Sequence, residues 1–268
     1  MTRAVLIGAT GRMGAAIVRA SAAGGIDIVA AIASAASKSA GRDVGEIAGV
    51  EARGVRVGTE LPADLGGAEV AIDFSRPDLT LRALDACRAA RVPIVIGTTG
   101  HESGFDARVD QASREIAVLV APNTSIGVAV ALELVRIAAR ALPAEFDIEI
   151  TEAHHKHKLD APSGTALALA VGAAQGRGLD PRTAIHSGRS GNQPRQGGEI
   201  GVASIRAGDV VGTHSVLFAG TGERLTVGHE ATDRSIFAQG AVRAAKWLAA
   251  QKPGRYTMAD VLGLKTIA

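Results

Sequence analysis

Histidine and lysine gather in one short stretch of this chain, residues 154–158, which reads His-His-Lys-His-Lys. Three of the chain's seven histidines and two of its six lysines fall there. Ammonium and imidazolium groups attract carboxylates, and both can donate a proton, histidine near neutral pH. A solvated charge run is the usual alternative, but such runs rarely concentrate histidine. The stretch therefore predicts a site that binds an anion and protonates it.

A second anion site is predicted directly after this stretch. Pro162, Ser163, Gly164 and Thr165 precede a helix expected over Ala166–Ala174. The free amides of its first turn and the two hydroxyls can hold a carboxylate. A metal site is disfavoured, because the lysines would repel a divalent cation and the chain has one cysteine. Together these features predict a small dicarboxylate substrate that gains a proton.

Glycines mark a possible cofactor site near the start of the chain. A strand over Ala4–Ile7 leads into the G-x-x-G-x-x-G stretch Gly8-Ala9-Thr10-Gly11-Arg12-Met13-Gly14, and a helix follows. Such glycines let the backbone approach a pyrophosphate at a helix N-terminus. A glycine turn of any α/β protein is the alternative. A dinucleotide here would supply the hydride for a reductase of a small polyanion.

The end of the second predicted strand bears on which dinucleotide binds. An acidic residue usually stands there to hold the ribose 2′-hydroxyl, but this chain has Ser34 and then Lys38. The segment can accept a 2′-phosphate, so we expect NADPH to bind at least as well as NADH; a solvated serine loop is the alternative. Small polar residues also end two later strands, and we expect them to line the nicotinamide ribose: Gly97, Thr98, Thr99, Ala121, Pro122, Asn123 and Thr124.

Two domains must position these residues. Up to about residue 125, short apolar runs alternate with alanine-rich helical stretches, which indicates a parallel sheet covered on both faces. After a helix over Ile126–Leu142, strand-like runs follow one another, with hairpin turns predicted at Gly208-Asp209 and Gly220-Thr221-Gly222. The predicted fold class is α/β: a Rossmann-type, doubly wound parallel sheet and a second α+β domain with a mainly antiparallel open sheet. Residues 1–125 and 235–268 are expected to bind the dinucleotide, and residues 126–234 the substrate and other subunits.

Composition narrows the function class. The net charge is +2 and 47% of the residues are hydrophobic, which disfavours a nucleic-acid partner and a disordered chain. The single Cys87 excludes an internal disulfide framework and suits a reducing compartment. Charged residues interrupt the longest apolar helix, so no membrane partner is expected and the protein is interpreted as cytoplasmic.

The motifs closely resemble the 4-hydroxy-tetrahydrodipicolinate reductase (dihydrodipicolinate reductase) family of diaminopimelate and lysine biosynthesis. The likeness covers Gly8–Gly14, Asp73-Phe74-Ser75, Gly97–Gly100 and Glu152–Ala166 in order. It implies reduction of a cyclic imine dicarboxylate by NADPH or NADH with release of water, in a homotetramer. It implies that His154 is a proton donor and acceptor and Lys158 a proton donor, that His155, Gly164 and Thr165 bind substrate, and that residues 8–13, 97–99 and 121–124 contact the cofactor. Members with dual cofactor use often have Glu-Arg where this chain has Ala33-Ser34. The family's contacts to the adenosine end of the cofactor are therefore not assigned to these two residues.

Two alternatives remain at this stage. A regulatory protein could bind NADP(H) and a dicarboxylate without turnover, but it would need no proton donor such as Lys158. Another two-domain dehydrogenase, acting on aspartate semialdehyde or homoserine, would share the first glycine motif and not the basic stretch. Arg189 and Arg195, in a Gly-, Arg- and Pro-rich loop, are further candidates to cover the substrate.

Overall fold

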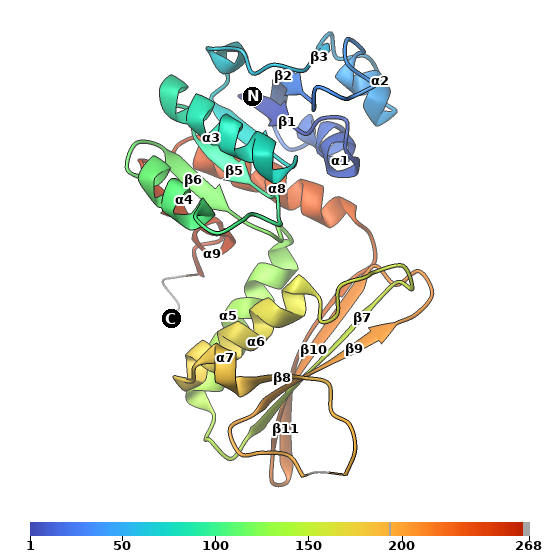
Figure 1. The fold of residues 1–268 in the computed structure, drawn as a ribbon, viewed down its shortest axis with the longest axis vertical. Coiled ribbons are helices and arrows are strands. Elements are labelled where there is room, and N and C mark those ends of the chain that lie inside the picture. Colours follow the sequence, from blue (N-terminus) through green and yellow to red (C-terminus); the bar gives the residue numbers. More distant parts are fainter. Residues whose placement is uncertain (193, 265–268) are drawn as a thin grey trace. The chain divides into compact units, whose positions relative to one another are not determined.

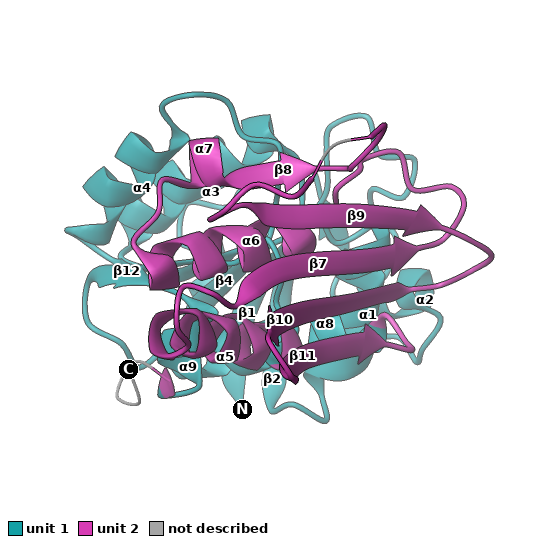
Figure 2. Ribbon diagram, turned by 90° about the horizontal axis from the view of Figure 1, so that it is seen from below, with its two compact units in different colours: residues 1–126, 235–263 teal, residues 127–234, 264–268 magenta. Residues whose placement is uncertain are grey.

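The computed structural model describes residues 1–192 and 194–264 of the chain. These residues form two compact units, which Figure 2 distinguishes by colour. Unit 1 comprises Met1–Ile126 and Ser235–Gly263, and unit 2 comprises Gly127–Arg234 with Leu264. Residues 265–268, which the sequence assigned to the dinucleotide-binding domain, lie outside the described residues.

A seven-stranded sheet forms the centre of unit 1, and all of its strand pairs are parallel. Its spatial order is β12-β6-β5-β4-β1-β2-β3, the doubly wound order with one further strand. The strands are β1 (Thr2–Ile7), β2 (Ile26–Ile32), β3 (Val57–Gly58), β4 (Val70–Asp73), β5 (Ile94–Ile96), β6 (Ala117–Val120) and β12 (Gly254–Tyr256). The predicted Rossmann-type sheet is confirmed.

Helices cover this sheet on both faces (Figure 1). They are α1 (Arg12–Ser21), α2 (Val44–Ala48), α3 (Pro77–Ala90), α4 (Phe105–Ser113), α8 (Ser235–Leu248) and α9 (Met258–Val261), with a short 3-10 helix, η1 (Leu65–Gly67). Alternate residues of β1 point to opposite faces. Val5 and Ile7 join a buried cluster with Leu84 of α3 and Val109 of α4, while α1 and α8 pack together on the other face. Burial on both faces explains the continuous apolar runs of these strands.

The second sheet, in unit 2, has five strands in the order β11-β10-β7-β9-β8 (Figure 2). The elements are α5 (Ile126–Ala141), β7 (Asp147–His154), α6 (Gly164–Arg177), α7 (Pro181–Ala184), β8 (Ile185–Ser187), β9 (Ile200–Arg206), β10 (Gly212–Gly220) and β11 (Glu223–Ala231). Two of its strand pairs are antiparallel and two are parallel. The sheet is therefore mixed, where the sequence indicated a mainly antiparallel one.

The hairpin predicted at Gly208-Asp209 is wrong. This turn joins β9 to β10, but β7 lies between them and pairs with both strands. The hairpin predicted at Gly220-Thr221-Gly222 is confirmed, since β10 and β11 pair directly. Turn residues alone did not distinguish a hairpin from a connection that passes over an intervening strand.

The two faces of β7 have different surroundings. Ile148 and Ile150 lie in a buried cluster with residues of α5 and α6, such as Val135 and Leu169. Thr151, one position on, is exposed. Helices therefore cover one face of the sheet, and β7 carries its even-numbered residues on that covered face. Among the described residues, no helix is both long and apolar enough to cross a lipid bilayer.

Candidate functional site

The parallel strands of unit 1 bring the predicted cofactor residues to one edge of its sheet. Residues 8–13 follow β1, Ser34 and Lys38 follow β2, 97–99 follow β5, and 121–124 follow β6. The carboxyl ends of parallel strands share one edge, and the strand order reverses between β1 and β4. In doubly wound sheets a ligand binds at this reversal.

Two glycines in the loop after β1 leave no room for side chains. A Cβ on Gly8, whose φ is +85°, would lie 2.1 Å from the carbonyl oxygen of Phe74. A Cβ on Gly14 would lie 2.3 Å from the carbonyl oxygen of Gly8. Gly11, at the N-terminus of α1, makes no side-chain capping hydrogen bond. The loop is thus closely packed against its own backbone. Because Gly11 has no side chain to accept from them, it does not cap the first backbone amides of α1.

A buried carboxylate ties two of these loops together. Asp73, at the end of β4, is 0% exposed. It accepts hydrogen bonds from the hydroxyls of Ser75 at 2.5 Å, Thr80 at 2.6 Å and Thr98 at 2.8 Å. Burial raises the pKa of Asp73, and the three hydroxyl donors oppose that rise. The Ser75 amide also donates to Thr98 Oγ1, so the loops after β4 and β5 hold one arrangement.

The other predicted cofactor residues divide into exposed and internally bonded ones. Ser34, Lys38 and Thr99 are exposed. Thr124 is buried, and its hydroxyl donates to the carbonyl oxygen of Phe237 at 2.6 Å. The side-chain oxygen of Asn123 accepts from the Ser125 amide. The first three are open to a ligand, whereas Thr124 joins the loop after β6 to α8.

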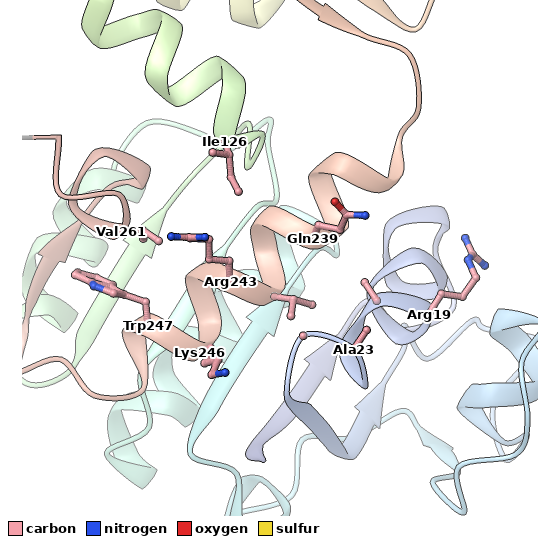
Figure 3. A pocket seen from close by; sticks show the side chains of 11 residues that line it. Arg19, Ala23, Ile126, Gln239, Arg243, Lys246, Trp247 and Val261 are labelled. Carbon is pink, nitrogen blue, oxygen red and sulfur yellow. The ribbon is translucent and has the colours of Figure 1, made fainter.

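Unit 1 also contains a cavity of about 780 Å³ along α1 and α8 (Figure 3). Its lining consists of Arg19, Ala20, Ala23, Gly24, Ile126, Gln239, Val242, Arg243, Lys246, Trp247 and Val261. None of these is a predicted cofactor residue, because the α1 members come from the C-terminal end of that helix. The cavity is therefore separate from the residues at the carboxyl edge.

In unit 2, the predicted proton donor His154 lies at the end of β7 and is 9% exposed. Its Nδ1 lies 2.6 Å from Oε2 of Glu152, two residues earlier on the same face. Arg206 donates to both oxygens of Glu152, at 2.9 and 2.8 Å, and the Ser163 amide donates at 3.1 Å. Glu152 thus orients the His154 ring, and Arg206 and the Ser163 amide in turn fix Glu152.

These contacts keep Glu152 ionised although it is almost fully buried. Burial alone would raise the pKa of this carboxyl, but hydrogen bonds from Arg206, His154, Ser204 and the Ser163 amide outweigh it and lower the pKa to about 2. A charge-assisted pair with Arg206 is the arrangement that makes a buried carboxylate tolerable. Glu152 therefore accepts hydrogen bonds and donates none at neutral pH.

A second histidine, His214 on β10, packs beside the first. Their ring centroids are 5.2 Å apart in an edge-to-face arrangement, and Nε2 of His214 lies 3.2 Å from the Ser163 hydroxyl. Burial, together with the nearby His154 and His229, lowers the pKa of His214 to about 4. His214 is therefore neutral at physiological pH and packs against His154 without adding charge to the site.

The loop after β7 and the start of α6 place the other predicted substrate residues. Lys158 pairs with both oxygens of Asp160, at 2.8 and 2.9 Å. Gly164 is the first residue of α6, and a Cβ there would meet nothing within 4 Å. The Ser163 hydroxyl caps α6 by accepting from the Ala166 amide. Burial lowers the pKa of His155. Electrostatic repulsion from Arg234 and, within the loop, from His157 and Lys158 lowers this pKa further.

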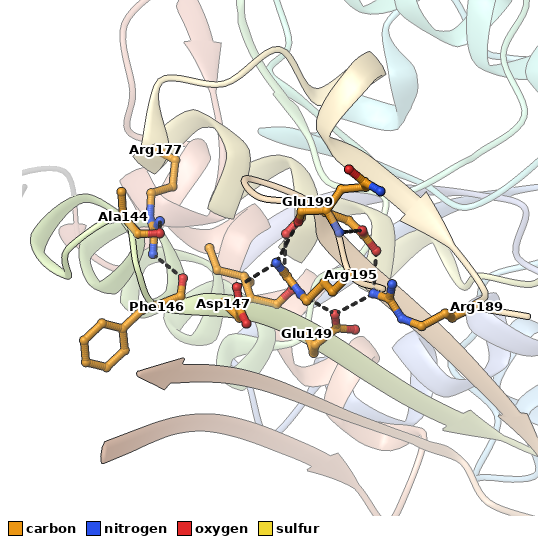
Figure 4. A network of polar contacts seen from close by, with 10 residues as sticks. Ala144, Phe146, Asp147, Glu149, Arg177, Arg189, Arg195 and Glu199 are labelled. Carbon is orange, nitrogen blue, oxygen red and sulfur yellow. Dashed lines mark hydrogen bonds and ion pairs between the residues drawn. The ribbon is translucent and has the colours of Figure 1, made fainter. Parts of the chain in front are cut away.

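Arg189 and Arg195, which the sequence suggested as residues that cover the substrate, form ion pairs with other residues. Both pair with Glu149 of β7, Arg189 also with Glu199, and Arg195 with Asp147 (Figure 4). Asp147 and Glu149 are odd-numbered residues of β7, on the face opposite to Glu152 and His154. The structure therefore places both arginines on the face of the sheet opposite to His154, and a role in covering the substrate stays a prediction.

Comparison with known proteins identifies the family of this chain. Family models described as "Dihydrodipicolinate reductase, N-terminus" and "C-terminus" match residues 2–124 and 127–262. The chain belongs to the dihydrodipicolinate reductase family. The 4-hydroxy-tetrahydrodipicolinate reductase of Alkalilimnicola ehrlichii is 49% identical over 267 residues, 98% of this chain and 99% of that protein. The one of Anaeromyxobacter dehalogenans strain 2CP-C is 47% identical, covering 99% of each. The resemblance noted in the sequence is confirmed.

Solved structures extend the likeness to the fold. A dipicolinate-bound dihydrodipicolinate reductase from Paenisporosarcina is 25% identical, with a TM-score of 0.77, over 97% of this chain and 98% of that one. An amine dehydrogenase from Mycobacterium smegmatis is 13% identical, with a TM-score of 0.62, over 96% of this chain and 95% of that one, and shares the fold alone.

Sequence reasoning missed the support around His154. Glu152 stands two residues before it in the chain, and this period-2 spacing on a strand is a signal that one face carries both side chains. Arg206 and His214 come from strands 50 or more residues further along, and only the strand register brings them to Glu152. No described group of three or more His, Cys, Asp or Glu side chains is arranged to hold a metal ion.

Proposed function

We propose that this protein is an NAD(P)H-dependent 4-hydroxy-tetrahydrodipicolinate reductase of diaminopimelate and lysine biosynthesis. The observation that carries this is the pairing of His154 with the buried Glu152, in a chain that has Lys158 on the following loop and whose relatives carry that name at 49% and 47% identity. An imidazole with one nitrogen fixed by a carboxylate is a general acid and base rather than a mere anion contact.

The glycine loop of unit 1 fits a dinucleotide. Gly8 and Gly14 let the loop fold closely, because a Cβ at either position would clash with a backbone carbonyl oxygen, and the first turn of α1 offers amides to a pyrophosphate. Gly8, Ala9, Thr10, Gly11, Arg12 and Met13 would hold the phosphates, and residues 97–99 and 121–124 the nicotinamide ribose. A bound reduced nicotinamide supplies the hydride that goes to C4 of the substrate ring.

The residues of unit 2 handle the carboxylates and the proton. Lys158, His155, Thr165 and the α6 amide at Gly164 bind the carboxylates of the substrate. Nε2 of His154 and the ammonium of Lys158 are the groups that deliver a proton to the carbon next to the one that receives the hydride, and water leaves from the hydroxylated ring. The ring thus gains one hydride and one proton and loses water, and the product is the reduced dicarboxylate.

Three finer properties belong to the same proposal. Ser34 and Lys38 are exposed beyond β2, and no carboxylate occurs from residue 34 to 39, which favours NADPH over NADH by attraction of the 2′-phosphate. On the face of the second sheet that the helices leave bare, Ile205 is an exposed apolar side chain, which suits assembly of a homotetramer. A biosynthetic enzyme with one buried free cysteine suits the cytoplasm.

The test is oxidation of NADPH, and then of NADH, followed optically with freshly made 4-hydroxy-tetrahydrodipicolinate. The wild type should consume both, and Lys158→Ala should reduce kcat by about 10²- to 10⁴-fold while cofactor affinity stays constant. Loss of absorbance with neither cofactor would refute the function. Full turnover in Lys158→Ala would refute the role of that lysine and favour a different proton donor.

The preference for NADPH has its own measurement. Lys38→Ala should weaken NADPH binding by about two- to fivefold and leave NADH binding unchanged, with Lys252→Ala as a matched cationic control. A wild type that binds NADH more tightly than NADPH in calorimetry would contradict it.

A further inference from the structure

The register of the second sheet places a continuous polar row beneath the proposed proton donor. Glu152 lies opposite Ser204 of β9 on one side and His214 of β10 on the other, and His214 lies opposite His229 of β11. Two residues further along β7 and β9, His154 lies opposite Arg206. Side chains at positions two apart share a face, so this arrangement puts Arg206, Glu152 and His154 within reach of one another.

Glu152 leaves His154 one choice of tautomer. A carboxylate whose pKa is held at about 2 carries no proton at neutral pH, so the hydrogen between it and His154 must come from the ring. The 2.6 Å contact is to Nδ1. Nδ1 therefore carries the hydrogen, and Nε2 of the neutral ring is the nitrogen with a lone pair.

Nε2 is directed at the position where the neighbouring strand has a glycine. A Cβ on Gly212 would lie 3.1 Å from Nε2 and 3.4 Å from Cδ2 of the same ring. A side chain at residue 212 would crowd this nitrogen. Gly212 keeps the space beside Nε2 open for a reacting group.

Arg206 connects the two proton-handling residues. It donates to both oxygens of Glu152, and it also donates to the backbone carbonyl oxygen of Asp160. The carboxylate of Asp160 is the partner of Lys158. One guanidinium therefore fixes the carboxylate behind His154 and the segment that carries Lys158, and its charge balances that of the buried Glu152.

We propose that Glu152, held by Arg206, is the positioning residue of this site. It keeps the ring hydrogen of His154 on Nδ1, so that Nε2, beside Gly212, is the atom that takes up and delivers the proton. This inference rests on the proposed function for its kinetic consequences, but the tautomer of His154 is a property of the protein alone.

Glu152→Gln tests the kinetic part. The amide can turn its NH₂ group toward Nδ1, which favours the tautomer with the hydrogen on Nε2. We expect kcat to fall by about 10²- to 10⁴-fold, with the KM of NADPH and of substrate changed less than about threefold. Glu152→Asp, which restores a carboxylate, should recover part of kcat. Glu149→Gln, on the other face of the same strand, is the matched control and should keep kcat.

The tautomer itself is read by ¹⁵N NMR of the histidine rings in the full-length wild type, at about pH 9 so that the rings are neutral. The His154 signal is assigned from its absence in His154→Gln. A hydrogen on Nδ1 supports the proposal, and a hydrogen on Nε2 overturns it, whether or not Glu152→Gln folds. Unchanged kcat in a folded Glu152→Gln also overturns it, as does an equal rise of both KM values with little loss of kcat. A wild type without turnover refutes the proposed function, and the NMR result still decides the role of Glu152.

Discussion

Burial of His214 makes the folding stability of this protein depend on pH in a way that one variant can isolate. The pKa of this ring is about 4 in the folded protein against an ordinary 6.5. A group with a lowered folded pKa stabilises the fold fully above its unfolded pKa, and that contribution is lost as the pH falls toward the folded pKa. His214 therefore contributes fully above about pH 6.5 and progressively less down to about pH 4.

The magnitude follows from the same two values. Since each pKa unit corresponds to about 1.4 kcal/mol, the whole effect is on the order of 3 kcal/mol. Between about pH 8 and about pH 5, the wild type should lose about 2 kcal/mol of unfolding free energy more than His214→Gln does. Comparing how the unfolding free energy changes with pH in the two proteins removes the contributions of groups that titrate in both. It also removes any cost of the substitution that does not depend on pH.

The assay is urea unfolding followed by circular dichroism at several pH values. His186→Gln, which removes an exposed histidine of the same unit, is the control and should keep the wild-type slope. Equal slopes in wild type and His214→Gln would refute the reasoning, because they would mean that His214 titrates alike in the folded and unfolded chains.

Three further outcomes follow from the described contacts. Below about pH 4.5 the wild type should lose stability again as Glu152 protonates toward its folded pKa of about 2, a loss that Glu152→Gln should not show in acid titrations followed by circular dichroism. Asp73→Ala removes the carboxylate that accepts from three hydroxyls, so it should lower the melting temperature and weaken NADPH binding at least about tenfold in calorimetry, while the KM of the substrate changes less; an equal weakening of both would contradict a local role. Gly14→Ala forces a Cβ against the carbonyl oxygen of Gly8 and should abolish NADPH binding or folding, whereas Gly197→Ala, in open space, should leave NADPH affinity unchanged.

Local patterns were sufficient to predict the parallel first sheet and its helices on both faces, but not its shortest strands. Its strands are buried on both faces, so they appear as continuous apolar runs that alternate with helical stretches. The short strands β3 and β12 were missed, because two and three residues carry little periodicity. The basic stretch and its position beside the α6 N-terminus were likewise predicted, since they depend on neighbours in sequence.

The support for His154 could not be predicted because it depends on strand pairing across long loops. β9 pairs with β7 in parallel, so Arg206 reaches Glu152 although the two residues are 54 positions apart in the sequence. The same pairing explains why the Gly208-Asp209 turn is no hairpin and why Arg189 and Arg195 meet β7 on its other face. Residue types gave the chemistry of the site, and only the register gave its orientation.

The alternation along β7 also determines where this chain tolerates a change in length. One residue inserted at the start of β7, with a shift of the whole strand by one position, would turn Glu152 and His154 toward the bare face and move Asp147 and Glu149, the partners of Arg189 and Arg195, to the covered one. An insertion among the exposed residues 188–192, between β8 and β9, leaves the pairing of β7 with β9 intact. Tags and circular permutation points therefore belong in that segment, and a single-residue deletion within β7 is a more complete inactivation than most substitutions.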